Sequence, residues 1–247
     1  MHKFLFSVFA GAILAPALIL AAGNTTNDSF AHAKKILGQV YEGHRMTLYC
    51  GAQYDEQGNI TLPEGFTTPK HEKRAQRIEW EHVVPAENFG RAFDEWREGS
   101  PECVDNRGKA FKGRKCAEKT SMDYRYMQAD MYNLYPAIGA VNAMRSNFNF
   151  QMLPGEESSF GSCAMKIADR KVEPPALARG QIARTYFYMQ DVYPLYRMSR
   201  QQEQLMGAWN KMYPVDEWEC TRAKRIEAAQ GNENKFVKEP CVEKRMW

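Results

Sequence analysis

The segment RIEWEHVVPAENFG, residues 77–90, decides the fold because it joins a strand pattern to a proline stop. Apolar and polar residues alternate in IEWE, which predicts a strand over residues 77–84. Pro85 restrains the preceding chain and ends regular pairing. Glu81 and His82 stand at this strand end, where adjacent side chains of an ideal strand would point to opposite faces. We therefore expect the strand to bend or finish there, so that both side chains reach one cleft edge.

His82 is the strongest candidate among the histidines that follow the N-terminal segment. His32 lies in a predicted helix and His44 and His71 lie in loop sequence, which favours surface or capping roles. A core imidazole satisfied by a neighbour is the alternative for His82, but it does not account for the acid directly before it. The chain has no H-E-x-x-H pair and no G-x-S-x-G elbow, so zinc-protease and serine-hydrolase readings lack support.

The mechanism that remains for Glu81 and His82 combines a hard metal ion with one general base. A carboxylate oxygen and an amide oxygen suit Mg²⁺, which keeps several waters and accepts a substrate phosphate. A neutral imidazole can deprotonate water near neutral pH. The amide is expected in DMYNLYPAIGAVNAMRSNFNF, residues 130–150, where Asn142 lies on a helix predicted to open at Pro136. Asn is mildly unfavourable inside a helix, whereas the other asparagines of this segment suit turns and caps.

The segments around this region predict an α+β fold with strands in the first half and helices in the second. Residues 44–76 are rich in turn residues and are expected to be loops or a hairpin, and residues 97–120, which carry many charges between two cysteines, are expected to be an exposed loop. Helices are expected after a cap at Asn27 or Ser29, over 176–196, after a capping box at Ser199 and Gln202, and over 215–231. No internal repeat or long linker is visible in the sequence.

Residues 1–22 have the layout of a secretory signal peptide, with a short basic start and an apolar stretch ending in ILAAG. We expect cleavage after Ala22, because Pro16 interrupts the stretch and no charge cluster follows it. An uncleaved anchor is the alternative, since the stretch is about long enough to span a bilayer. The expected mature chain, residues 23–247, is then periplasmic or secreted and free of the membrane.

Net charge and cysteine content restrict the classes of protein to which the chain can belong. Loss of Lys3 leaves 32 basic against 30 acidic residues, a net charge of +2, so any basic surface must be local. No C-x-x-C pair is present, and an even number of cysteines in an exported chain favours disulfides over a zinc site. Short loops suggest two pairs and leave a third: Cys103–Cys116, Cys220–Cys241 and Cys50–Cys163.

Four ordered motifs together resemble the bacterial endonuclease I family of the ββα-metal, or His-Me finger, superfamily. They are RIEWEHVVPAENFG, DMYNLYPAIGAVNAMRSNF, CAMKIADRKVEPPALARGQIARTYFYM and LMGAWNKMYPVDEWEC, and the similarity runs from about residue 28 to the C-terminus. The resemblance implies a mixed α+β fold with a ββα-metal core motif and a helical C-terminal portion. It also implies an exported nuclease that cuts DNA with little sequence specificity.

The resemblance assigns roles to individual residues. Glu81 and Asn142 would bind one divalent cation, Mg²⁺ with Mn²⁺ or Ca²⁺ as alternatives, and His82 would be the general base. Arg114 in KGRKC is the best match for the arginine that contacts the phosphate. A solvated charge run is the alternative there. The expected additional phosphate-binding residues are Lys115, Arg145, Arg179 and Arg184.

Several positions depart from the family pattern. Gln128 stands where members commonly have a catalytic Glu, so the chain would use a metal-bound water for that step or act more slowly. Tyr132 stands where His is frequent, and Ala143-Met144-Arg145 replaces GDR. Ala52 stands in place of a second cysteine, which suggests one bridge fewer.

The resulting expectation is a monomeric endonuclease for double- and single-stranded DNA that leaves 5′-phosphate ends. It is either sugar-non-specific, with RNA as a further substrate, or DNA-preferring. Two rivals stay open at this point. One is a non-catalytic nucleic-acid-binding protein derived from a nuclease, for which Gln128 would be a sign of decay. The other is a metal-dependent phosphodiesterase for small substrates.

Overall fold

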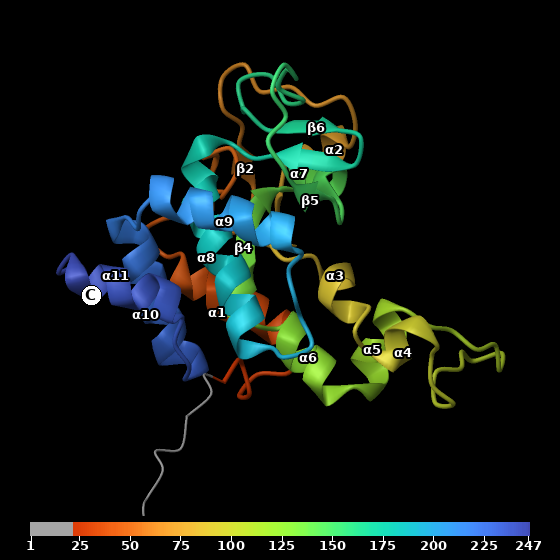
Figure 1. Ribbon diagram of the computed structural model, residues 1–247. Coiled ribbons are helices and arrows are strands. Elements are labelled where there is room, and N and C mark those ends of the chain that lie inside the picture. Colours follow the sequence, from red (N-terminus) through yellow and green to blue (C-terminus); the bar gives the residue numbers. More distant parts are fainter. Residues whose placement is uncertain (1–21) are drawn as a thin grey trace, which may run out of the picture.

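The computed structural model describes residues 22–247, and the expected signal segment lies outside this range except for Ala22 (Figure 1). Helices and small sheets alternate along the chain, which confirms the α+β class. In chain order the elements are α1 Phe30–Val40, β1 Gln53–Tyr54, β2 Ile60–Thr61, α2 Glu72–Ala75, β3 Ile78–His82, α3 Ala86–Gly90, α4 Asp94–Arg97, α5 Arg114–Thr120, α6 Met122–Gln128, the 3₁₀ turn η1 Met131–Asn133, β4 Leu134–Ile138, α7 Gly139–Arg145, β5 Asn149–Phe150, β6 Lys166–Ala168, β7 Lys171–Glu173, α8 Ala176–Val192, α9 Arg200–Met212, α10 Glu217–Gln230 and α11 Lys235–Glu243.

The antiparallel pair β3–β4 lies at the centre of the molecule (Figure 1). Every residue of β4 is buried, which accounts for its continuous apolar run LYPAI. The register pairs Glu81 with Tyr135 and His82 with Leu134. Strand β3 ends at His82, as predicted, so Glu81 and His82 come from the last two positions of a central strand.

The prediction that Pro136 opens a helix is wrong. Pro136 lies in the middle of β4 opposite Trp80, and the helix α7 begins three residues later at Gly139. A two-stranded sheet has two edges, so the missing N–H of a proline can face away from the ladder. The Pro136 carbonyl accepts a hydrogen bond from the Leu48 amide instead.

Helix α7 follows β4 directly and completes the ββα unit with β3. Gly139 stands at the junction because a Cβ there would lie 2.5 Å from the carbonyl oxygen of Arg74. This close approach brings α7 against α2 and β3. Asn142 is thereby held one turn along α7, beside the strand that carries Glu81.

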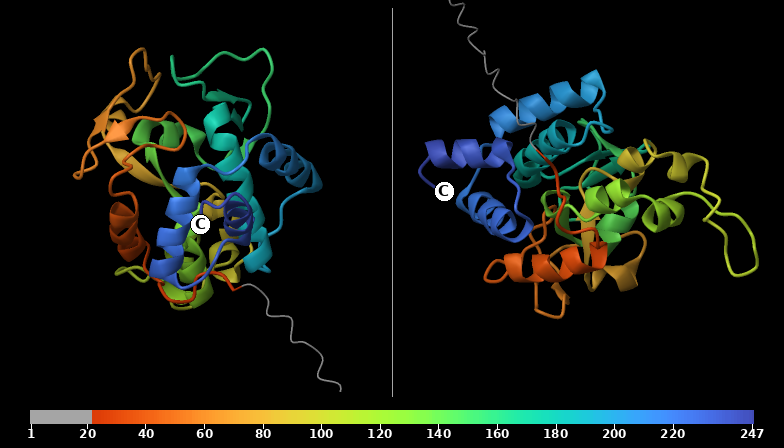
Figure 2. Two further views of the ribbon diagram at one scale, coloured as in Figure 1. Left: turned by 90° about the vertical axis from the view of Figure 1, so that its left-hand side faces the viewer. Right: turned by 90° about the horizontal axis from the view of Figure 1, so that it is seen from below.

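Helices α8 to α11 form the other part of the molecule and cover one side of the β3–β4 pair (Figures 1 and 2). Helices α8 and α9 pack along each other, and the disulfide Cys220–Cys241 joins α10 to α11. Local capping chemistry agrees with the predicted starts. Ser29 accepts a hydrogen bond from the His32 amide, and Ser199 accepts one from the Gln202 amide.

The segment 97–120 is only partly the loop that we expected. Its last part forms α5, and Cys103–Cys116 closes a loop that projects from the body between α4 and α5 (Figures 1 and 2). Cys50–Cys163 is the third disulfide, so the pairing agrees with the one suggested by loop lengths. Within residues 22–247 no helix has the length and apolar content needed to cross a bilayer.

Candidate active site

A cleft of about 600 Å³ opens beside the end of β3. Side chains from α1, β3, α3, α5 and α7 line this main cleft. They include five of the residues that the sequence singled out: Glu81, His82, Arg114, Asn142 and Arg145. Segments that lie far apart along the chain therefore meet at one hollow, as the ββα arrangement requires.

Glu81 is almost fully buried at the floor of the main cleft. Its Oε1 accepts a hydrogen bond from the Tyr49 hydroxyl at 3.0 Å and lies 3.0 Å from a guanidinium nitrogen of Arg145. Among residues 22–247 its Oε2 has no hydrogen-bond partner. Burial raises the pKa of the Glu81 carboxyl to about 7, against the opposing effects of Arg145 and Tyr49. The carboxylate charge is thus only partly compensated by the protein.

Asn142 is oriented by the carboxylate of Glu79, which lies on β3 like Glu81. Its Nδ2 donates a hydrogen bond to Oε2 of Glu79 at 2.8 Å. Glu79 is fixed in turn by Arg74, whose Nε and Nη2 donate to the two carboxylate oxygens at 2.7 and 2.5 Å. Because the amide nitrogen is engaged, the oxygen Oδ1 is the atom of Asn142 left to bind a ligand.

His82 has a fixed tautomer. Its Nε2 lies 2.8 Å from the backbone carbonyl oxygen of Gln128, and a carbonyl can only accept, so Nε2 carries the proton. Nδ1 is then the unprotonated nitrogen of the neutral ring. Burial, together with the charge of Arg114, lowers the pKa of His82 to about 3 and keeps the imidazole neutral at physiological pH. The ring packs against Phe30, with ring centroids 4.9 Å apart.

Arg114 reaches the main cleft from the first residue of α5. Its Nε donates to Oε1 of Gln128 at 2.9 Å and to Oε1 of Glu118 at 3.1 Å. Within the described chain its two terminal nitrogens have no hydrogen-bond partner, so they are available for an anionic ligand. Gln128 therefore contributes twice: its carbonyl orients His82 and its side chain orients Arg114.

The donor set of the main cleft fits a hard divalent cation. The two available atoms, Oε2 of Glu81 and Oδ1 of Asn142, are oxygens, and such a pair suits a cation that retains waters. In residues 22–247 no three His, Cys, Asp or Glu side chains cluster as a closed metal cage would require. All six cysteines form disulfides, so a thiolate zinc site is excluded.

The other predicted basic residues do not all reach the main cleft. Arg145 borders the main cleft but is completely buried, and it donates to the carbonyls of His82 and Val83 at 3.0 and 2.6 Å, so it supports the strand end and Glu81. Lys115 is exposed on α5 and does not line the cleft. Arg179 is bound to Glu173 at 2.8 Å and to the Tyr213 hydroxyl at 3.2 Å, outside the cleft lining.

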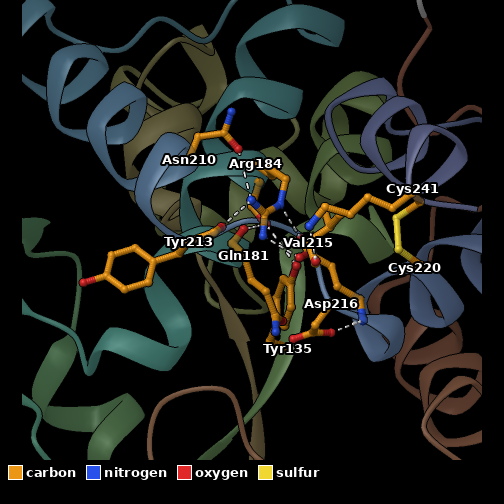
Figure 3. Close-up of polar contacts among 12 residues, drawn as sticks. Tyr135, Gln181, Arg184, Asn210, Tyr213, Val215, Asp216, Cys220 and Cys241 are labelled. Carbon is orange, nitrogen blue, oxygen red and sulfur yellow. Dashed lines mark hydrogen bonds and ion pairs between the residues drawn. A yellow bond between two sulfur atoms is a disulfide. The ribbon is translucent and has the colours of Figure 1, made fainter. Parts of the chain in front are cut away.

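Arg184 lies in the joint between α8, α9 and α10. It pairs with both carboxylate oxygens of Glu219 and donates to Asn210 and to the Tyr213 carbonyl (Figure 3). Only 2% of Arg184 is exposed. The expectation that it binds substrate is therefore corrected: the charge and donors are already satisfied inside the protein.

Glu79 and Tyr49 are site residues that sequence reasoning missed. The alternation of β3 could have revealed Glu79, because residues two apart on a strand share one face. Nothing in the sequence links Tyr49 to Glu81, since 32 residues and a bend separate them. Tyr132, where the family often has His, is buried and donates to the carbonyls of Ala223 and Asn232, which gives it a structural place.

Comparison with known proteins identifies the family of the chain. The family model described as Endonuclease I matches residues 33–241. An extracellular deoxyribonuclease of Aeromonas hydrophila is 41% identical over 221 residues, which cover 87% of this chain and 91% of the relative. A periplasmic deoxyribonuclease of the same species is 40% identical, covering 87% of each chain. Endonuclease-1 of Buchnera aphidicola subsp. Acyrthosiphon pisum is 37% identical, covering 89% and 84%.

Proposed function

The chain belongs to the endonuclease I family, and on this premise we propose that it is an exported, metal-dependent endonuclease that hydrolyses DNA. Residues 23–247 form the proposed nuclease domain after removal of the signal segment, and the protein acts as a monomer in the periplasm or outside the cell. The observation that carries the proposal is the meeting of Glu81, His82, Arg114 and Asn142 at one cleft.

His82 is the proposed general base. A water in the main cleft attacks the phosphorus of a backbone phosphodiester, and Nδ1 of His82 takes its proton. The bond between phosphorus and the 3′ oxygen breaks, and the departing oxygen takes a proton from a solvent water, which leaves a 5′-phosphate and a 3′-hydroxyl. The hydrogen bond from Nε2 to the Gln128 carbonyl stabilises the imidazolium that forms, and the negative phosphate beside it favours the same charged state.

Arg114 is the proposed phosphate-binding residue. Its terminal nitrogens can form two parallel hydrogen bonds to phosphate oxygens, and Gln128 and Glu118 hold the Nε side of the guanidinium in place. Gln128 cannot donate a proton as a carboxylic acid, so we assign it a positioning role and not an acid–base role.

Glu81 and Asn142 would hold the cation through Oε2 and Oδ1, and Mg²⁺ is the proposed ion. When bound, the ion offsets negative charge on the phosphate and stabilises the departing oxygen. Arg145 and Tyr49 keep the Glu81 carboxylate in place, while Glu79 keeps the amide oxygen of Asn142 as the free one.

Contacts to the phosphate backbone account for low sequence specificity, because phosphates carry no direct sequence information. The same contacts exist on single strands and on RNA, so we include RNA as a further substrate.

Cleavage of supercoiled plasmid, with and without EDTA, tests the proposal on the wild-type protein and on His82→Ala. We expect nicking with magnesium, none with EDTA, and a loss of about 10²–10⁴-fold in the variant. If the protein also cleaves a small diester, inhibition of that cleavage by excess long DNA would support the endonuclease over the small-substrate phosphodiesterase. A wild-type protein that binds DNA and never cuts it would instead support the non-catalytic rival.

A further inference from the structure

A second cleft of about 560 Å³ lies next to the main cleft. The two hollows share Asn147, and α3 and residues 146–149, together called the ridge here, contribute lining residues to both. This ridge is held together by side-chain bonds: Asn147 donates to Glu87 at 2.6 Å and Asn88 donates to Asn149 at 3.2 Å. A ligand that extends out of the main cleft over the ridge would enter the second cleft.

The second cleft is strongly basic. Four cations line it, Arg91, Arg170, Lys171 and Arg197, against a single acid, Asp169. Arg91 pairs with Glu87 on the ridge, whereas the other three cations have no carboxylate partner in residues 22–247. Arg197 is fixed by donating to the backbone carbonyls of Gln190 and Tyr196 at 2.8 and 3.2 Å, so its positive charge stays uncompensated.

A buried donor without a partner also lines this hollow. Gln202 lies in the first turn of α9 and is 8% exposed, and its Nε2 has no hydrogen-bond partner in the described chain. Its backbone amide binds Ser199, but the reciprocal side-chain bond of the expected capping box is not made. An unpaired buried donor is costly, so a ligand acceptor at this position would remove the cost. The positive end of the α9 dipole adds to the attraction for an anion.

The hairpin turn between β6 and β7 places Arg170, in a backbone conformation unfavourable for arginine, at the same cleft. Ala168 pairs with Lys171, so Asp169 and Arg170 form a two-residue turn, with φ values of +46° and +59°. Such turns favour Asp-Gly, because the second position needs a positive φ. Arg170 occupies the glycine position, and its guanidinium lies 5.5 Å from the centroid of the Phe148 ring. The arginine is therefore unfavourable for the turn and has a charge directed to the basic hollow.

We propose that the second cleft binds a backbone phosphate of the same nucleic-acid strand, at a position outside the scissile phosphate. Lys171, Arg170 and Arg197 supply the charge, and Gln202 supplies the hydrogen bond. This inference rests on the proposed function, because the occupant is the nucleic acid that the main cleft cuts. The site would increase affinity for long substrates and leave the chemical step unchanged.

The variant Arg170→Gly separates a binding role from a structural one. It creates the favoured Asp-Gly turn, so we expect the thermal midpoint to stay or rise while DNA binding weakens several-fold. Binding is measured by fluorescence anisotropy in the His82→Ala background, which prevents cleavage, with duplexes of increasing length and at several salt concentrations. Lys211→Ala, which removes a charge from the far end of α9, is the matched control.

The dependence of DNA affinity on duplex length and on salt concentration decides whether the second cleft binds a phosphate. We expect Arg170→Gly and Lys171→Ala each to reduce the salt slope of log affinity by about 0.9 with long duplexes and to change nothing with duplexes too short to leave the main cleft. Gln202→Leu should weaken only the long duplexes. Equal losses for short and long duplexes, or no loss relative to Lys211→Ala, would overturn the second phosphate site while leaving the nuclease proposal intact. If the His82→Ala protein binds no DNA and the wild type does not cut it, both proposals fail.

Discussion

Two buried arginine–glutamate pairs, Arg145–Glu81 and Arg184–Glu219, differ in how completely the protein satisfies them. In the helical joint, Arg184 bonds both oxygens of Glu219 and its remaining nitrogen bonds Asn210 and Tyr213 (Figure 3). At the main cleft, Arg145 contacts one oxygen of Glu81 and leaves the other without a protein partner. The two pairs have the same residue types and similar burial.

From this difference we infer that the Arg145–Glu81 pair serves the proposed chemistry and that the Arg184–Glu219 pair is structural. A buried charge that is fully paired and hydrogen-bonded has no remaining capacity for a ligand. The free oxygen of Glu81 faces a hollow beside a fixed amide oxygen and a neutral imidazole, which is what cation binding requires. Satisfaction of donors and acceptors, more than burial or charge, separates the proposed active site from the core.

The largest expected effect comes from removing the incompletely satisfied carboxylate. Glu81→Gln should lower the cleavage rate at a fixed magnesium concentration by about 10³-fold, because a Lewis-acid contribution is several kcal/mol. The measurement is the initial rate of plasmid nicking. Glu219→Gln is the matched control, and its rate per folded molecule should equal that of the wild type. A similar rate loss in both variants would remove the distinction between the pairs.

The reverse pattern is expected for stability. Arg184→Met leaves Glu219 buried and unpaired, so the free energy of unfolding should fall by about 3–5 kcal/mol. Urea denaturation followed by circular dichroism gives this value. Glu81→Gln should cost much less, because Arg145 still donates to the carbonyls of His82 and Val83. A stable Arg184→Met protein with impaired DNA binding would revive the substrate-binding role that the sequence suggested.

A substitution of Glu79 tests whether the amide of Asn142 needs the hydrogen bond to the Glu79 carboxylate. Glu79→Ala removes the acceptor for Nδ2 and frees the amide to rotate, so the magnesium concentration for half-maximal cleavage should rise about 10–100-fold. The maximal rate should be restored at high magnesium, which a simple loss of folding would not allow. No change in the magnesium requirement would mean that Asn142 is held by the helix alone.

Gln128→Ala should have the smallest effect. The backbone carbonyl that orients His82 remains, and only the acceptor for the Arg114 side chain is lost. A hydrogen bond to a charged group contributes about 1.5–3 kcal/mol, and Glu118 still pairs with Arg114, so we expect a loss of about 10-fold in kcat/KM. A loss as large as that of His82→Ala would instead assign the Gln128 side chain a direct part in proton transfer.

Local signals in the sequence predicted the local structure well. The alternation before Pro85 located the central strand, and Ser29 and Ser199 marked helix starts, because capping depends on residues within one turn. The helix predicted at Pro136 failed for a non-local reason. Proline at a helix start and proline in an outer strand have the same local sequence, and only the pairing with Trp80 distinguishes them.

The site could be predicted only as far as the resemblance and the strand pattern reached. Glu81, His82 and Asn142 stand in recognisable motifs, whereas the second carboxylate, Glu79, acts through a partner 63 residues away. Arg184 and Arg114 are both arginines on helices, and nothing local shows that one meets Glu219 and the other a cleft. Roles that depend on which distant partner a charge finds require the three-dimensional structure.

The most direct test of the account is the binding of Mn²⁺, measured by electron paramagnetic resonance on the wild type, His82→Ala and Glu81→Ala. It asks whether a carboxylate and an amide hold the cation beside a separate base. We predict that wild type and His82→Ala bind one ion with equal affinity and that Glu81→Ala binds none, while only the wild type cuts DNA. Unchanged binding by Glu81→Ala, or loss of binding by His82→Ala, would contradict the account.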